Sequence, residues 1–293
     1  MQSDRSNFEQ PDWNQVWQRS QQRYDATPSY HDSVHLWGEK KNAARYDLNS
    51  REQYSARVQQ TIRDLHPNRK ERVLDIGAGP GTLALPLSPL VRSVTTVEPA
   101  GGMVEVLKEH IQSEGIDNIT CIQKRWEDVN STEDLAPPYD LVIVSFSLVM
   151  IDLWAAISKM NQVTDGLVAL YWFVDNSFWE QQYLTLWPEL HHAHFSPGPK
   201  ADIVFNLLYQ HGIYADIRMF PADKTYRFRD MEEAYQFFAP RFSITDQRQE
   251  GVLRTHLDLT RVVIPDGVLF TSPSTYARIS WRTDQKRSGS PVR

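Results

Sequence analysis

The chain has 293 residues, a net charge of −6 at pH 7 and a single cysteine, Cys121. This length can bury a sizeable core in one large domain or in a core domain with a cap, and one cysteine excludes an internal disulfide and a cysteine-based zinc site. The acidic balance argues against a nucleic-acid partner. Without a long apolar run or a signal-peptide pattern, we expect a cytoplasmic protein with no membrane partner.

The first 66 residues predict a helical arm. Trp13 and Trp17 lie at helical spacing, and residues 39–65 contain helix formers without Gly or Pro and carry an apolar stripe. Pro67 closes this segment. From there on, the pattern alternates between strand and helix, which indicates a parallel sheet covered on both faces.

A strand that runs into a nucleotide-binding turn is predicted at residues 73–81, which read Val-Leu-Asp-Ile-Gly-Ala-Gly-Pro-Gly. The three glycines lack a Cβ, so the backbone can turn tightly and a flat ligand can lie against it. The spacing misses the dinucleotide pattern G-x-G-x-x-G, because position 82 is Thr. The carboxylate of Asp75, before the first glycine, suits a ligand with cationic groups and would repel a diphosphate.

A second strand, at residues 93–97, ends at Glu98, about 20 positions after the first glycine, the spacing at which a carboxylate reaches a ribose diol in a βαβ unit. Residues 118–128 read as a third strand with its turn, and residues 139–146 as a fourth strand. Taken in this order, residues 70–175 resemble the class I S-adenosylmethionine-dependent methyltransferases.

The resemblance implies an α/β fold with a doubly wound, mostly parallel seven-stranded sheet, the Rossmann-like methyltransferase fold. It implies S-adenosyl-L-methionine as cofactor and S-adenosyl-L-homocysteine as product, with Asp75 under the amino-acid end and Glu98 on the ribose hydroxyls. Many relatives carry an Asp at the adenine turn where this chain has Arg125, so we expect Glu127 and the backbone of Trp126 to meet the adenine. The expected cofactor-binding residues are Asp75, Gly77, Ala78, Gly79, Gly81, Glu98, Pro99, Met103, Trp126, Glu127, Ser145 and Phe146.

The resemblance also suggests a role for the arm. Class I methyltransferases commonly build a lid ahead of the first strand, and residues 36–46 resemble the aromatic entry segment of their small-molecule members. Trp37 and Tyr46 are therefore expected at the lid or the substrate, with simple packing between helix and sheet as the alternative. His31 and His35 lie four positions apart without a third ligand nearby, and we expect no metal site.

The second half of the chain predicts more strands with a cap built between them. Strands are expected at residues 166–174 and 214–220, helices at 230–238 and 249–263, and a last strand at 275–281, inserted antiparallel if the family topology holds. The expected division is a helical arm or lid at 1–66, the methyltransferase domain at 67–282 with cap insertions near 176–200 and 222–270, and a disordered tail at 283–293.

The reaction that the resemblance implies is methyl transfer by in-line displacement to a nucleophile. A general base is needed only where the acceptor must lose a proton, and the candidates are Asp152, His191 and His194. Aromatic residues in the arm and after the fifth strand favour a small, partly apolar acceptor over a polymer. An RNA or protein acceptor, or a cofactor-binding protein without turnover, is the alternative, and the sequence indicates no oligomeric state.

Overall fold

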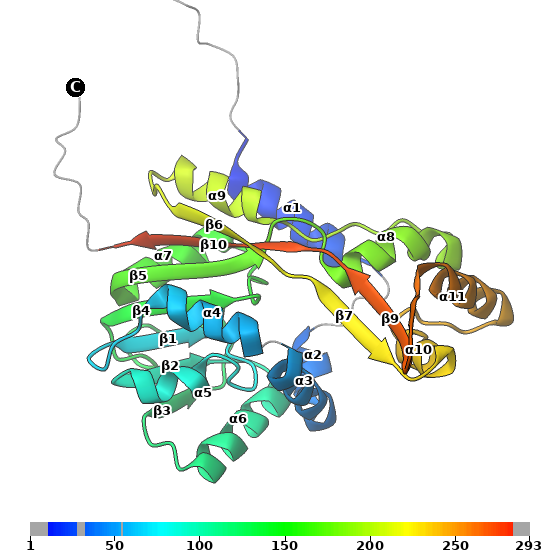
Figure 1. Ribbon diagram of the computed structural model, residues 1–293. Coiled ribbons are helices and arrows are strands. Elements are labelled where there is room, and N and C mark those ends of the chain that lie inside the picture. The colour runs from blue at the N-terminus through cyan, green and yellow to red at the C-terminus, as the bar shows by residue number, and fades with distance from the viewer. Residues whose placement is uncertain (1–10, 28–32, 54, 284–293) are drawn as a thin grey trace, which may run out of the picture.

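The computed structural model describes residues 11–27, 33–53 and 55–283. A seven-stranded sheet with helices on both faces forms the main body, and a smaller cap stands beside it (Figure 1). The strands of the main sheet are β1 (Arg72–Ile76), β2 (Ser93–Val97), β3 (Ile119–Ile122), β4 (Tyr139–Ser145), β5 (Thr164–Phe173), β6 (Asp216–Pro221) and β10 (Thr275–Arg282).

The strand order is β3-β2-β1-β4-β5-β10-β6. The pairs from β3 to β5 are parallel, whereas β10 runs antiparallel to both β5 and β6. Strands β1 and β4 are apolar and buried along nearly their whole length, as expected for the centre of a sheet that helices cover on both sides. The predicted fold is therefore confirmed, including the antiparallel last strand.

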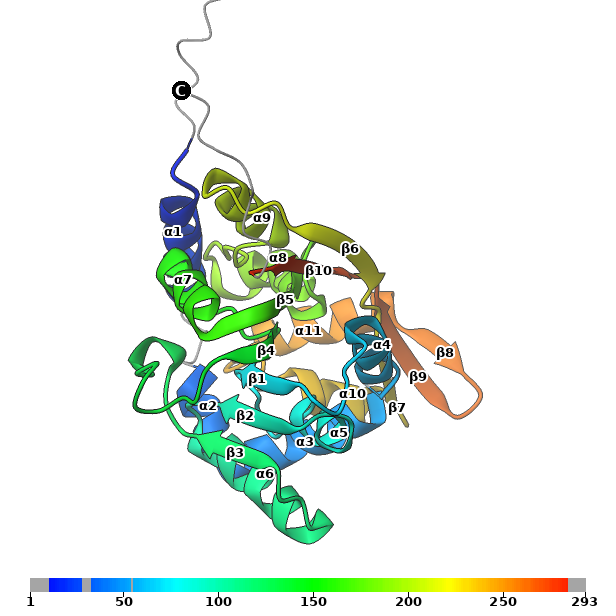
Figure 2. The same ribbon diagram turned by 90° about the vertical axis from the view of Figure 1, so that its left-hand side faces the viewer.

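Different helices cover the two faces of the sheet (Figure 2). On one face lie α1 (Trp13–Asp25), α7 (Leu153–Val163) and α9 (Ala201–Gln210), whose apolar side chains join the largest core cluster. On the other face lie α4 (Ser55–Leu65) and the short α5 (Ala84–Leu87), which is followed by the 3-10 turn η1 (Ser88–Leu90).

The predicted helical arm does not fold as one separate unit. Trp17 of α1 is fully buried in the main core, and its indole N–H donates to the carbonyl oxygen of Met150 at 2.8 Å. Val58 and Leu65 of α4 pack on the opposite face of the sheet. Among the described helices of the arm, α2 (Ser33–Gly38) and α3 (Lys40–Gln53) dock on α6 (Gly101–Glu114). Residues 1–10, 28–32 and 54 lie outside the described residues.

Two connections, one from β6 and one to β10, join the cap to the main sheet. β6 leads into β7 (Lys224–Phe228), and β9 (Gly267–Ser272) leads into β10, so β7 and β9 pair beyond the sheet (Figure 1). β8 (Val262–Ile264) completes a second, three-stranded sheet. This sheet packs with α8 (Phe178–His191), α10 (Met231–Phe238) and α11 (Gln247–Thr260) around a separate apolar cluster.

The two predicted cap insertions thus form a single body with its own core. The second insertion contains the two predicted helices and, in addition, three strands that the sequence did not predict. The helix expected at residues 249–263 ends at Thr260. Val262 and Val263 instead pair with β9, because β-branched residues favour a pleated strand over a helix.

The described chain ends at Thr283, whose N–H and hydroxyl donate to the main-chain oxygen of Gly166. The predicted disordered tail, residues 283–293, otherwise lies outside the described residues. None of the helices in the described part of the chain has the length and apolar character needed to cross a membrane.

Candidate functional site

The loop after β1 carries the three predicted glycines, each with its own structural reason. A Cβ on Gly77 would lie 2.3 Å from the Cβ of Ser147, and one on Gly81 would lie 2.5 Å from a methyl carbon of Leu107. Glycine is required at these two positions because other residues of the same chain lie too close for a side chain. Gly79 has a φ of +57° and no described atom within 4 Å of where its Cβ would stand. The loop is therefore open to a ligand at Gly79.

Asp75 lies in β1 just before this loop and is 2% exposed. Its Oδ2 atom has no hydrogen-bond partner among the described residues. Burial, followed by the negative charge of Glu98, raises the pKa of Asp75 to about 7. A buried acceptor without a partner is destabilising, and a cationic ligand group would relieve that cost. This unpartnered oxygen fits the cationic amino-acid end of the cofactor that the sequence predicts.

Glu98 follows β2 and joins the glycine loop to α6. Its carboxylate accepts from the N–H of Gly79 and from the N–H of Ala100, each at 2.9 Å. Burial raises the pKa of Glu98, and these two hydrogen bonds partly oppose the shift. A carboxylate has about four acceptor positions, so two remain for hydroxyl donors. Pro99, between Glu98 and α6, is half-buried. In the glycine loop, the N–H of Ala78 donates a weak hydrogen bond to the main-chain oxygen of Val97.

The carboxyl end of β4 lies against the glycine loop, as the predicted sites require. The hydroxyl of Ser147 donates to the main-chain oxygen of Ile76 at 2.8 Å. Phe146 adopts a left-handed φ of 57°, a strained conformation for a residue with a side chain. Arg57 of α4 donates to the hydroxyl of Ser145 at 3.2 Å, and its guanidinium lies 4.8 Å from the centre of the Phe146 ring. The sequence did not predict a role for Arg57.

The predicted adenine turn is the 3-10 turn η2 (Trp126–Asp128) after β3. The Trp126 ring is buried, and its N–H donates to the main-chain oxygen of Ala156. Lys159 donates to the main-chain oxygens of Trp126 and Glu127. The Trp126 side chain is thus part of the core, while the Glu127 side chain is exposed at the turn. An adenine contact by Glu127 or by the Trp126 backbone remains a proposal.

The predicted lid residues Trp37 and Tyr46 pack together at the start of α6. Their ring centroids are 5.2 Å apart, and both rings contact a small cluster that includes Met103. The backbone comes still closer, since a Cβ on Gly102 would lie 2.7 Å from the main-chain oxygen of Trp37. Lys40 of α3 forms ion pairs with Glu105 and Glu109 of α6. The α2–α3 segment therefore lies beside α6, the helix that Glu98 joins to the glycine loop.

The candidate bases do not meet at this site. Asp152 is the N-cap of α7, where its carboxylate accepts from the N–H of Ala155 at 2.9 Å and from the amide of Asn14 at 3.0 Å. These contacts give Asp152 a structural role. The ring of His191 packs on Trp187, and its Nε2 lies 2.8 Å from the main-chain oxygen of Phe242 in the cap.

His194 follows α8 and is exposed. No group of three or more His, Cys, Asp or Glu side chains that could hold a metal occurs among the described residues. His31, half of the histidine pair considered above, lies outside them.

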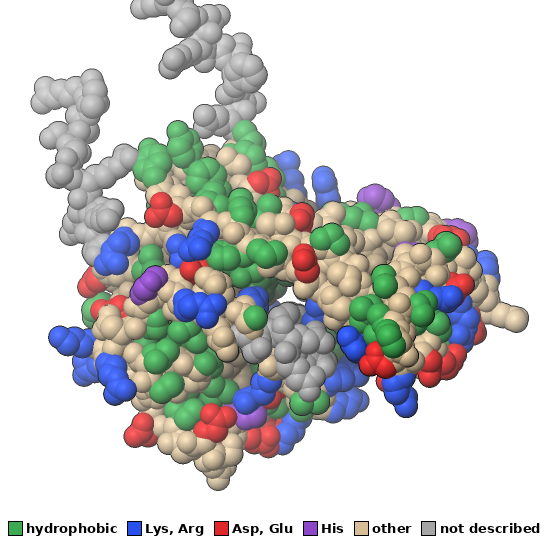
Figure 3. All heavy atoms as spheres, viewed as in Figure 1, with side chains coloured by type: hydrophobic (Ala, Val, Ile, Leu, Met, Phe, Trp, Pro, Cys, Tyr) green, Lys and Arg blue, Asp and Glu red, His purple; other side chains and the backbone are tan. Residues whose placement is uncertain are grey.

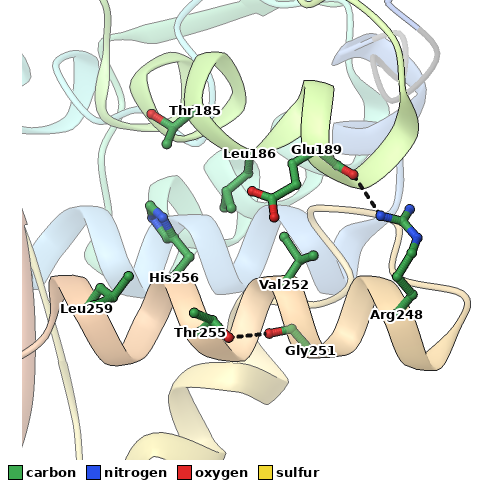
Figure 4. Close-up of a pocket in the computed structure, with 9 residues that line it drawn as sticks. All are labelled: Thr185, Leu186, Glu189, Arg248, Gly251, Val252, Thr255, His256 and Leu259. Atoms are coloured by element: carbon green, nitrogen blue, oxygen red, sulfur yellow. Dashed lines mark hydrogen bonds between the residues drawn. The ribbon is translucent and has the colours of Figure 1, made fainter.

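A separate pocket of about 400 Å³ lies in the cap between α8 and α11 (Figure 4). Its wall includes Leu186 and Val252, and Arg248 spans it by donating to the main-chain oxygen of Glu189 at 2.9 Å. Its lining includes none of the predicted cofactor or base residues. We interpret this pocket as a space left where the two cap helices pack against each other.

Part of the chain is similar to known protein families and structures. A methyltransferase domain family matches residues 73–165. An uncharacterized protein of Haemophilus influenzae is 35% identical over 106 residues, which are 36% of this chain and 38% of that protein. The 23S rRNA (uracil(1939)-C(5))-methyltransferase of Idiomarina loihiensis is 34% identical over 84 residues, which are 29% of this chain and 18% of that enzyme. The chain thus spans well under half the length of these two relatives.

The solved structure of the YcgJ protein of Bacillus subtilis shares the fold, with a TM-score of 0.52 and 18% identity over 79% of this chain and 98% of that one. The sequence match covers the glycine loop, Glu98 and β4, and the seven-stranded sheet is mostly parallel with an antiparallel last strand, as predicted. Residues 73–165 of the chain therefore form a methyltransferase domain, and the sheet has the Rossmann-like fold of the class I methyltransferases.

Proposed function

We propose that the protein transfers a methyl group from S-adenosyl-L-methionine to a small-molecule acceptor and leaves S-adenosyl-L-homocysteine. The observation that carries this proposal is the buried Oδ2 atom of Asp75, which lacks a described partner beside a glycine loop that is open at Gly79. Glu98 supports it, because its two oxygens hold the loop and keep acceptor positions for hydroxyl groups.

When bound, the cofactor would supply a methyl group on a sulfonium centre, which needs no further activation. Asp75 would pair with the cationic end of the ligand, and Glu98 would accept from ribose hydroxyls. The remaining task of the protein is to hold the acceptor in line and to exclude water. Aromatic rings at the carboxyl end of β4 suit that task, since Phe146 lies 4.9 Å from Phe173 and 5.3 Å from Tyr276, centre to centre.

A small acceptor is favoured by the segments that surround this end of the sheet. The α2–α3 segment lies on one side and the cap strand β7 on the other (Figure 1). A site that is covered from two sides suits a small molecule better than a polymer. An RNA acceptor, as the printed name of the Idiomarina enzyme describes for that enzyme, or a protein acceptor is the competing proposal. A cofactor-binding protein without turnover is the third.

Calorimetric titration with S-adenosyl-L-methionine and S-adenosyl-L-homocysteine tests the cofactor proposal. We expect micromolar binding to the wild type and at least tenfold weaker binding to Asp75→Asn and to Glu98→Gln. Asp117→Asn is the matched control, because Asp117 is exposed and lies before β3, at the opposite edge of the sheet. Binding that ignores both substitutions would refute the site assignment, and binding without transfer to any acceptor would favour the third proposal.

A further inference from the structure

Arg57 of α4 contacts two successive residues of the turn that follows β4. Its guanidinium donates to the hydroxyl of Ser145, the last residue of β4, at 3.2 Å. The same guanidinium lies 4.8 Å from the centre of the ring of Phe146, the next residue of the chain. Arg57 is half-buried, and partial burial strengthens both a charged hydrogen bond and the attraction of a cation to an aromatic face. This side chain is therefore placed to fix the turn.

Phe146 needs such support because its backbone is left-handed, with a φ of 57°. This conformation is unfavourable for any residue with a side chain and rare for a bulky one. The other described non-glycine residues with a positive φ follow helices: His66 comes after α4, His192 after α8, and Ser243 after the turns at the end of α10. A left-handed residue is common there. Phe146 instead follows a strand, where strain of this kind often marks a functional site.

The left-handed turn at Phe146 directs the chain from β4 towards the glycine loop. The N–H of Phe146 still donates to the main-chain oxygen of Tyr171 in β5 at 3.0 Å. One residue later, the hydroxyl of Ser147 donates to the main-chain oxygen of Ile76 at 2.8 Å. Ser147 lies so close to Gly77 that a Cβ on that glycine would be 2.3 Å from the Ser147 Cβ. The shape of the turn and the shape of the glycine loop are therefore linked.

The helix that carries Arg57 is anchored to the sheet. Val58 of α4 is buried against it. Near the end of the helix, the carboxylate of Asp64 accepts from Arg218 of β6 at 2.9 Å, and the main-chain oxygen of Asp64 accepts from Arg278 of β10 at 3.2 Å. A side chain on such a rigid element can hold a neighbouring turn in one geometry.

A purely structural role is the alternative for Arg57. The Phe146 ring also packs against Phe173 and Tyr276, so the guanidinium could add stability to an aromatic cluster and nothing more. The contact between Ser147 and the glycine loop favours a role at the site, because the residue that Arg57 holds directly precedes Ser147.

We infer that Arg57 is a positioning residue of the cofactor site, which holds Phe146 in its left-handed conformation and thereby keeps Ser147 against the glycine loop. This inference rests on the proposed methyl transfer and adds a residue of the N-terminal arm to its site. Arg57 acts through the turn and not through contact with the cofactor. Without the guanidinium, the turn relaxes, Ser147 withdraws from Ile76, and the glycine loop loses the contact that shapes it.

The test is calorimetric titration of the full-length protein with S-adenosyl-L-homocysteine. Arg57→Met removes the charge and the donors but keeps a long unbranched side chain, and we expect it to bind at least fivefold more weakly than the wild type. Arg57→Lys keeps a cation over the Phe146 ring and should bind within twofold of the wild type. Arg57→Gln keeps a donor without the charge and replaces Arg57→Met if that variant does not fold. Circular dichroism and melting temperature show whether each variant folds.

A double-mutant cycle tests whether Arg57 acts through Phe146. Asn adopts the left-handed conformation more readily than Phe and carries no aromatic ring. In a Phe146→Asn background, Arg57→Met should therefore weaken the binding of S-adenosyl-L-homocysteine by less than twofold, instead of fivefold. A purely structural role would lower the melting temperature of Arg57→Met and leave its affinity for S-adenosyl-L-homocysteine within twofold of the wild type.

Arg63→Met is the matched control, because it makes the same change on the same helix. Lys and Arg side chains lie on the outer surface over α4 and β6 in the space-filling view (Figure 3). Arg63 is exposed and donates to Gln60 of its own helix at 2.9 Å. This variant should bind S-adenosyl-L-homocysteine like the wild type.

The inference and the proposed function fail in different ways. If the wild type binds S-adenosyl-L-homocysteine and Arg57→Met binds it equally well, the cofactor proposal stands and the positioning role of Arg57 is refuted. An equal loss of affinity from Arg57→Met in both backgrounds, or from Arg57→Met and Arg63→Met alike, also overturns that role. Absence of binding to the wild type refutes the proposed function and, with it, this inference.

Discussion

Asp75 and Glu98 place two buried carboxylates at the ends of neighbouring parallel strands. Glu98 is held by two backbone N–H groups, whereas the Oδ2 atom of Asp75 has no described partner. Burial and then the charge of Glu98 therefore raise the pKa of Asp75 to about 7. The free protein carries an electrostatic cost at this site that a cationic ligand would remove.

Because of this electrostatic cost, we expect the Asp75→Asn variant to be more stable than the wild type. The folded-state pKa of Asp75 lies above its ordinary value of 3.8, so the stabilisation from its bound proton is complete below about pH 4 and is lost as the pH rises to about 7. The asparagine side chain of the variant cannot ionise, so the variant does not lose this stabilisation. We expect Asp75→Asn to melt at least about 2 °C above the wild type at pH 8.5, with a smaller difference at pH 5. A variant that melts lower at both pH values would contradict the assigned pKa.

Docking of the α2–α3 segment depends on the missing side chain of Gly102. A methyl group there would lie within 2.8 Å of main-chain atoms of residues 37–39, whereas a Cβ on Gly101 meets only the flexible Gln123 amide at 3.2 Å. We expect Gly102→Ala to expose the segment to trypsin at Lys40 and to weaken binding of S-adenosyl-L-homocysteine severalfold.

Gly101→Ala is the control for this prediction. It adds the same methyl group to the same first turn of α6 and should leave both proteolysis and affinity as in the wild type. If Gly102→Ala loosened the segment while affinity stayed constant, Trp37 and Tyr46 would be packing residues rather than parts of a lid.

The role assigned to Asp152 is also testable. Replacing an N-cap aspartate by alanine costs about 0.5–2 kcal/mol of stability, and this side chain also joins Asn14 of α1 to α7. We expect Asp152→Ala to lower the free energy of unfolding by about 1–2 kcal/mol and to leave the affinity for S-adenosyl-L-homocysteine unchanged. Normal stability combined with lost methyl transfer would restore Asp152 as a catalytic candidate.

The part of the fold that the sequence predicted consists of local signals. The apolar run before Gly77, the strand before Glu98 and the strand at Tyr139–Ser145 are each specified by neighbouring residues. The cap strands were missed because they are short and find their partners far along the chain: Lys224 pairs with Ser272, for example. The short period-two pattern at residues 224–228 carries little weight before that pairing is known.

The site likewise has a part that the sequence predicted and a part that only the structure shows. Asp75 and Glu98 were found from their spacing in sequence, but the unpartnered oxygen of Asp75 depends on burial by the whole sheet. Asp152 was a base candidate by residue type, and its capping contacts appear only in three dimensions.

The most direct measurement of the central claim is the number of protons that leave the protein when S-adenosyl-L-homocysteine binds. Calorimetry at pH 6 in two buffers of different ionisation enthalpy gives this number. If Asp75 receives the cationic end of the ligand, a group with a pKa of about 7 must ionise on binding, and about 0.9 protons should be released, falling towards zero at pH 8.5. Asp75→Asn should release none. Binding without proton release in the wild type at pH 6 would contradict the assignment of Asp75 to the cofactor.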